Sequence, residues 1–122
     1  MSYDIRLVDK VTRETLCADF EPPAGGVMML GESRHGNPCH LNVTYNYADH
    51  FYKHMDKERG IRSIYGMTAK ESIPVLEKAI AKLGDDVDPD YWKGTEGNAK
   101  AALKGLLTIA RAADPNGVWT GD

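Results

Sequence analysis

The chain has 122 residues, of which 42% are hydrophobic and 27% charged, with a formal net charge of −3. This length and composition predict a single globular domain, residues 1–122, that is large enough to build its own hydrophobic core. The slightly acidic balance argues against nucleic acid as a partner, because nucleic-acid-binding domains carry clustered Lys and Arg.

The sequence shows no apolar run long enough to span a membrane and no apolar secretion signal at its N-terminus. Its two cysteines, Cys17 and Cys39, are too few for a disulfide framework. We therefore expect a protein of a reducing cytoplasm, in which both thiols stay reduced, and no membrane partner.

Four stretches in the first part of the chain have the alternation or the apolar run that is typical of β-strands. They are residues 3–8, 15–20, 27–30 and 41–47. A short polar segment separates the first two, which indicates a β-hairpin. The prolines and glycines at 22–26 end this hairpin, because proline removes a hydrogen-bond donor from the ladder. The order of the four stretches predicts an antiparallel meander.

The remainder of the chain is predicted to be helical. The three predicted helices cover residues 47–60, 68–84 and 95–114. In the second helix, Thr68 stands three residues before Glu71, which is the spacing of a capping box. Pro74 would be costly so far inside a helix, so Ser72 is an alternative N-cap. Thr95 is the expected cap of the third helix. The buried side of that helix is expected to carry Leu103, Leu106, Leu107 and Ala110.

Strands followed by helices predict an α+β fold, with about three helices covering one face of a sheet of about four antiparallel strands. The covered side of the stretch LNVTYNY is expected to carry Leu41, Val43, Tyr45 and Tyr47. Asn42, Thr44 and Asn46 would then face water, a ligand or a second subunit, because unpaired buried amides would cost about 1–3 kcal/mol each.

Four residues raise the question of a metal site. Cys39 and His40 are adjacent, and His50 and His54 are one helical turn apart. However, no glutamate follows His50 as it does in a zinc protease, and adjacent strand residues point to opposite sides. For the same geometric reason Cys39 and His40 do not form a thiol–imidazole pair, and no serine has a recognisable base nearby in the sequence. We therefore predict no metal, no cofactor and no catalytic residue, and keep a metal-dependent hydrolase using His40, His50 and His54 as an alternative.

The segment GIRSIYGMT, residues 60–68, opens the second predicted helix. It is not a P-loop, because its glycine spacing is wrong and Met67 replaces the lysine. A helix N-terminus beside an arginine can still hold an anion, so Arg62, Tyr65 and Thr68 are candidates for binding a nucleotide-like ligand. The predicted recognition surface joins them to the strand residues Asn42, Thr44, Asn46 and Tyr47.

About three-quarters of the chain resembles a group of small phage and prophage proteins. The segments that carry this resemblance are HLNVTYNYADHF, GIRSIYGMTAKESIPVLEKAIAKL, DYWKGTEGNAKAALKGLLTIA and PNGVW. The group has no established activity, so no catalytic role is carried over. The resemblance implies a phage-type accessory protein in the cytoplasm of a bacterial host, one that blocks a host defence by binding.

We therefore predict a non-enzymatic binding protein. Its partner would be either a host protein that it occludes or a small anionic, nucleotide-like ligand that it sequesters. Besides the metal-dependent hydrolase, a second alternative stays open, in which the polar strand face is a subunit interface of a homo-oligomer.

Overall fold

A computed structural model describes residues 1–21, 27–29, 36–90 and 92–122 of the chain. The helices of this described part are α1 (Ala48–His54), α2 (Ala69–Lys82) and α3 (Glu96–Ala112). Its strands are β1 (Ser2–Val8), β2 (Cys17–Ala18), β3 (Val27–Met29), β4 (Asn37–Pro38), β5 (His40–Thr44) and β6 (Val118–Gly121). The predicted α+β class is confirmed. None of the described helices is both long enough and apolar enough to cross a lipid bilayer.

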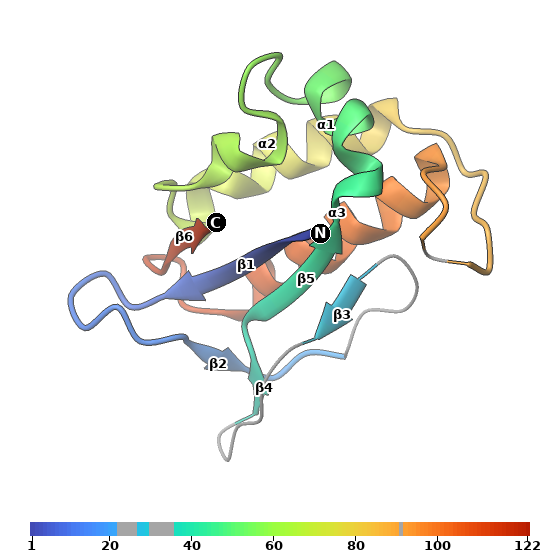
Figure 1. The fold of residues 1–122 in the computed structure, drawn as a ribbon. Coiled ribbons are helices and arrows are strands. Elements are labelled where there is room, and N and C mark those ends of the chain that lie inside the picture. The colour runs from blue at the N-terminus through green and yellow to red at the C-terminus, as the bar shows by residue number, and fades with distance from the viewer. Residues whose placement is uncertain (22–26, 30–35, 91) are drawn as a thin grey trace.

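The main sheet is antiparallel and has the strand order β3-β5-β1-β6 (Figure 1). The predicted meander of N-terminal strands is therefore wrong, because β6, from the C-terminal end, takes the place beside β1. After a bridge between Val8 and Thr15, the chain leaves β1, and β2 pairs with β4 in a separate sheet. β6 is held beside β1 by the burial of its Trp119. This side chain is 1% exposed, and its Nε1 donates to the buried Ser72 hydroxyl (2.8 Å).

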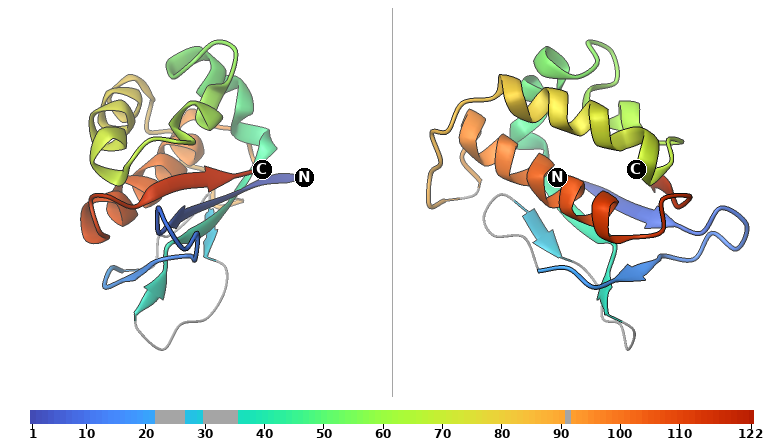
Figure 2. Two further views of the ribbon diagram at one scale, coloured as in Figure 1. Left: turned by 90° about the vertical axis from the view of Figure 1, so that its left-hand side faces the viewer. Right: turned by 180° about the vertical axis from the view of Figure 1, so that it is seen from behind.

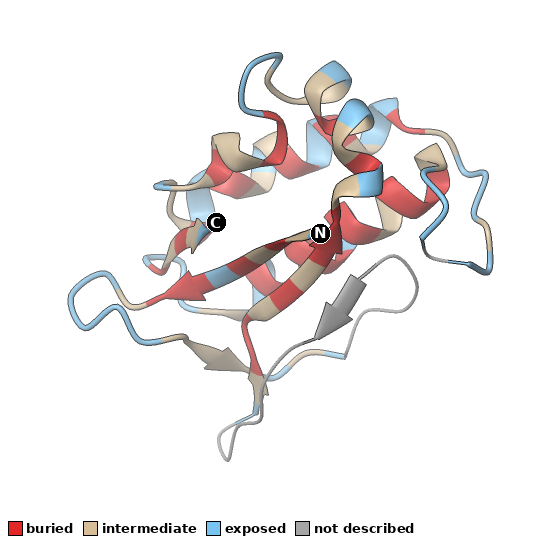
Figure 3. Ribbon diagram, in the orientation of Figure 1, coloured by how far each residue is buried: buried red, intermediate tan, exposed pale blue. Residues whose placement is uncertain are grey.

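The helices cover one face of the main sheet. α3 lies behind the sheet in Figure 1 and in front of it in the right-hand view of Figure 2, and α2 packs along α3. The side chains of β1 and β5 that face the helices are buried, and Figure 3 shows the resulting alternation along both strands. They are Tyr3, Ile5, Leu7, Leu41 and Val43. The opposite side of these strands, which we call the outer face, carries polar residues.

The first helix is shorter than predicted. α1 ends at His54 instead of Gly60, and the chain then continues into a 3-10 helix at Gly60–Ile64. The cause is Asp56, whose carboxylate accepts the backbone N–H groups of Glu58 (2.9 Å) and Arg59 (2.7 Å). A short acidic side chain that bonds to nearby backbone in this way competes with the helical ladder.

The second and third helices begin where the capping residues predict. Thr68 caps α2, with a capping box in which its hydroxyl accepts from Glu71 N (3.1 Å) and the Glu71 carboxylate accepts from Thr68 N (3.0 Å). The alternative cap at Ser72 is wrong. Pro74 lies inside α2, and the carbonyl that loses its partner belongs to the exposed Lys70, where water can replace the missing N–H. α3 is capped by Thr95 as predicted, and its four expected leucine and alanine residues are buried.

Candidate functional site

The three polar strand residues of the predicted recognition surface do not form one row. β5 ends at Thr44, and the chain turns into a 3-10 helix at Tyr45–Tyr47. Thr44 is buried instead of exposed, and its hydroxyl accepts the N–H of Asn46 (3.2 Å). Tyr47 is fully buried, as expected for the covered side. The predicted alternation of covered and exposed residues is therefore correct for residues 41–43 and wrong from Thr44 onward.

Asn42 lies on the outer face, as predicted. It stands opposite Asp4 of β1, and its amide donates to Asp4 Oδ1 (2.8 Å) and to Ser2 Oγ (2.6 Å). Asn42 therefore positions the carboxylate of Asp4 across the strand pair.

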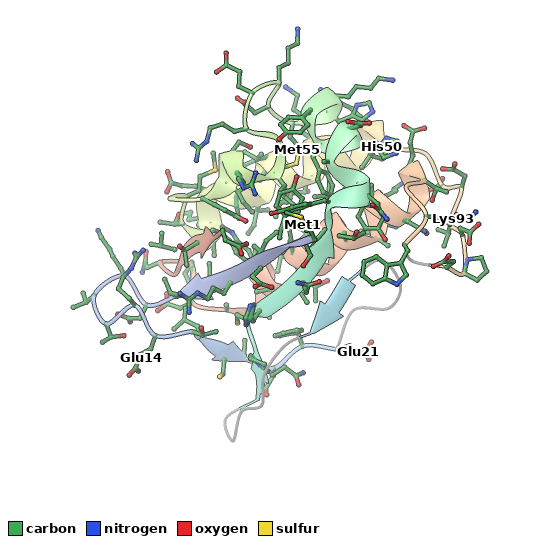
Figure 4. All side chains as sticks on the ribbon, viewed as in Figure 1. Met1, Glu14, Glu21, His50, Met55 and Lys93 are labelled. Atoms are coloured by element: carbon green, nitrogen blue, oxygen red, sulfur yellow. The ribbon has the colours of Figure 1, made fainter. Side chains whose placement is uncertain are left out.

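Asn46, in the 3-10 helix before α1, and His50, in α1, bond to the segment between α2 and α3, described at residues 83–90 and 92–95, which we call the connector. Asn46 Nδ2 donates to the carbonyl oxygen of Trp92 (2.6 Å), and His50 Nε2 donates to that of Gly94 (2.7 Å). A Cβ atom on Gly94 would lie 2.5 Å from the Asn46 carbonyl oxygen, so the contact requires glycine. Figure 4 shows His50 and Lys93 on the same side of the molecule. The polar groups of Asn46 and His50 thus hold the fold together.

The connector is organised from the other side by Asn98, near the start of α3. Its side chain is 1% exposed and makes three hydrogen bonds to connector backbone. Oδ1 accepts from Asp88 N (3.0 Å), and Nδ2 donates to the carbonyl oxygens of Asp90 (3.1 Å) and Lys93 (3.0 Å). The segments NVTYNY and DYWKGTEGNA, which carry much of the sequence resemblance, therefore meet at the connector and have a structural role there.

Arg62 and Tyr65, two further predicted binding residues, fasten the end of β6. The Arg62 guanidinium lies 4.8 Å from the ring centre of Tyr3, and it donates to the Asp122 carbonyl oxygen (2.9 Å) and to the Tyr45 hydroxyl (3.2 Å). The Tyr65 hydroxyl donates to the same carbonyl oxygen (3.4 Å), and burial raises the pKa of Tyr65. These contacts leave Arg62 less available to an anion than the sequence suggests.

Thr68 and the first turn of α2 are also occupied. The N–H groups of Thr68 and Glu71 are bound within the capping box, and those of Ala69 (2.8 Å) and Lys70 (3.2 Å) donate to carbonyl oxygens of the turn 115–117. The Glu71 carboxylate stands where an anion would bind, and its hydrogen bond from Thr68 lowers the pKa of Glu71. These four amides therefore offer no unpaired donor to an anionic ligand.

The outer face has a hollow of its own, where β1, β5 and β6 meet. It has a volume of about 320 Å³ and is lined by Asp4, Arg6, His40, Gly121 and Asp122. The antiparallel register places Arg6 between His40 of β5 and Thr120 of β6. We call this group of five lining residues the outer hollow.

The charges of the outer hollow are only partly paired within the protein. Asp122 Oδ1 accepts the N–H of Asp4 (2.9 Å), which ties the two acidic residues together. Arg6 is exposed, and no described carboxylate lies within ion-pair distance of it. Burial lowers the pKa of His40; Arg6 also lowers it, and Asp4 and Asp122 oppose the shift. The imidazole is therefore neutral near pH 7, and its Nε2 is buried with no hydrogen-bond partner in the described part of the chain.

Most of the outer hollow was missed in the sequence. Its β1 members could have been found, because Asp4 and Arg6 alternate with the apolar residues of the first predicted strand. Asp122 could not, because nothing in the sequence pairs the C-terminal segment with the first strand.

The candidate metal ligands do not come together. His40 lies on β5, whereas His50 and His54 lie on α1, where His54 Nε2 is 3.5 Å from Glu96 Oε1. Across the described ranges, no three His, Cys, Asp or Glu residues are placed to hold a metal ion. Cys39 is fully buried, and burial raises the pKa of its thiol to about 12, so thiolate is scarce at neutral pH.

Comparisons with known proteins give no relative from which a role could be taken. No family model, no curated protein and no solved structure matches the chain. The case for a function therefore depends on the geometry of the outer hollow and of the clusters around it.

Proposed function

We propose that this protein is a non-enzymatic binding protein and that the outer hollow is its binding site. The observation that carries the proposal is the Arg6 guanidinium, which has no ion-pair partner among the described residues and lines one concave, polar site together with two carboxylates. Charged groups gathered in a concavity, and not used inside the chain, are typical of ligand sites. In the phage context that the sequence resemblance implies, such a protein would act by sequestering a ligand or by occluding a host protein.

The dimensions of the outer hollow favour a small ligand over a large partner surface. Ligand sites in proteins have volumes of about 300–1,000 Å³, and the volume of about 320 Å³ stands at the lower end of that range. A small molecule, or one side chain of a partner protein, would fit into it.

The lining supports binding more than catalysis. Catalysis by a serine, threonine or cysteine nucleophile requires a hydroxyl or thiol beside a base, and the five lining residues contribute no such hydroxyl or thiol. The neighbouring Cys39 is buried with a pKa of about 12, which makes it a poor nucleophile. The alternative of a metal-dependent hydrolase needs His40, His50 and His54 at one site, but His40 lies apart from the two histidines of α1.

The charges also change the kind of ligand that we propose. Two carboxylates face one guanidinium, and the imidazole of His40 is neutral, so the site does not favour a nucleotide-like anion. Arg62, for which the sequence predicted an anion-binding role, already bonds to Asp122 and Tyr45. We therefore place the site on the outer face and not at the start of α2.

Amide NMR spectra test this proposal. The uniformly labelled protein would be mixed with the fraction of a bacterial extract below about 1 kDa, and we expect shifts concentrated at the amides of residues 4, 6, 40, 121 and 122. The shifts should vanish in Arg6→Gln and persist in Arg59→Gln, since Arg59 is an exposed arginine outside the outer hollow. A spectrum that stays unchanged, or that changes only around Thr68, would refute the proposed site.

A further inference from the structure

We infer that the outer hollow recognises a zwitterion, meaning a small ligand that carries an ammonium group and a carboxylate group a few ångströms apart. This inference rests on the proposed function and names its ligand class. It follows from three features of the outer hollow: two carboxylates that each have one oxygen held by the protein, a guanidinium with no ion-pair partner among the described residues, and the two-residue spacing of Asp4 and Arg6 along β1.

The carboxylates of Asp4 and Asp122 form the end that receives a cation. Each has one oxygen held by the protein, since Asp4 Oδ1 accepts from Asn42 (2.8 Å) and Asp122 Oδ1 accepts from Asp4 N (2.9 Å). No described cation lies within ion-pair distance of either carboxylate. A carboxylate can accept about four hydrogen bonds, and an ammonium has three donors to offer. The two acidic side chains are thus oriented in advance, with acceptor capacity to spare.

Arg6 forms the end that receives an anion. It stands two residues from Asp4 on the same side of β1, so the backbone sets the two side chains out from points about 7 Å apart. The planar guanidinium binds a carboxylate through two parallel hydrogen bonds, and it is exposed here with no carboxylate of the described residues within ion-pair distance. His40 faces Arg6 across the strand pair and is neutral, so it adds no competing charge.

The arrangement discriminates between ligands by their charge pattern. A simple amine would be attracted by the two carboxylates but repelled by Arg6. A simple carboxylate would be attracted by Arg6 but repelled by the two carboxylates. A zwitterion whose charges match the spacing along β1 gains both attractions and meets neither repulsion. An α-amino acid such as glycine holds its two charges closer together than this spacing, whereas a linear ω-amino acid spans it.

Four small compounds test the inference by amide NMR titration. They are 5-aminopentanoate, pentylamine, pentanoate and glycine. We expect 5-aminopentanoate to shift the outer-hollow amides with a Kd at least tenfold lower than any of the other three. Both Arg6→Gln and Asp4→Asn should raise that Kd at least tenfold, while Arg59→Gln and Asp49→Asn, which change exposed residues outside the outer hollow, should leave it unchanged.

The possible results separate the inference from the proposal on which it rests. If pentylamine or pentanoate binds as tightly as 5-aminopentanoate, or if no compound shifts the outer hollow while the bacterial extract does, the zwitterion inference is wrong and the binding site stands. If neither the compounds nor the extract shifts these amides, both are wrong. Because Arg6 is exposed, we expect the Arg6→Gln variant to fold like the original protein. The dispersion of its amide spectrum checks that it is folded.

Discussion

The connector and the outer hollow are both polar, yet they differ in whether their polar groups are used within the chain. Around the connector, the side chain of Asn98 makes three hydrogen bonds, and Asn46 and His50 each bond to a backbone carbonyl. In the outer hollow, Arg6 has no ion-pair partner among the described residues. Residue types associated with recognition thus serve the architecture in one region, whereas charged strand residues stay available for a ligand in the other.

The largest effect that this comparison predicts is on Asn98. Asn98→Ala should lower the free energy of unfolding by about 2–4 kcal/mol, because three hydrogen bonds to buried or partly buried backbone are lost at about 1 kcal/mol each. Urea denaturation measures the change. Asn98→Asp keeps the acceptor for Asp88 N but sets a carboxylate oxygen against the carbonyl oxygens of Asp90 and Lys93 at a buried position, so its loss should be at least as large. A loss below about 0.5 kcal/mol for the alanine variant would contradict the structural role of the connector contacts.

A smaller loss of stability is expected when Asn46 or His50, which both bond to the connector, is replaced. Asn46→Ala and His50→Ala should each cost about 1 kcal/mol, since each removes one hydrogen bond to a connector carbonyl. The loosened connector should be cut faster by trypsin after the exposed Lys93, which limited proteolysis with mass spectrometry measures. Cleavage after Lys57, on the far side of α1, is the internal control. Equal acceleration at both lysines would indicate global destabilisation instead.

The contrast between the two regions also explains what the sequence could predict. Local signals were sufficient for the capping box at Thr68, the cap at Thr95 and the apolar side of α3, because each depends on residues within a few positions. The place of β6 and the position of Asp122 depend on pairing across almost the whole chain. Whether an amide is satisfied, as at Asn46, depends on the tertiary partner that it meets.

A modest effect with a defined sign is expected from His40. Burial lowers its pKa in the folded protein, so below about pH 6.5 the unfolded chain binds more protons than the folded one. Stability should therefore fall as the pH is lowered through this range, and part of that fall should disappear in His40→Gln. Urea denaturation at pH 7.5 and pH 5.5 measures the difference, and NMR titration of the ring should give a pKa below the usual value. An identical pH dependence in the variant would contradict the burial of the imidazole.

The smallest expected effect, and the most discriminating, is that of Arg6→Gln on stability. Because Arg6 is exposed and has no ion pair in the described structure, the free energy of unfolding should change by no more than about 0.5 kcal/mol. Arg62→Gln is the matched comparison, since that guanidinium stacks on Tyr3 and donates to Asp122 and Tyr45; it should cost about 1–3 kcal/mol. If the two variants were equally destabilised in urea, Arg6 would be part of the architecture, and the case for a ligand at the outer hollow would lose its main support. If only Arg62→Gln is destabilised, while Arg6→Gln stays stable and loses the ligand-induced shifts, the two arginines differ in role as well as in bonding.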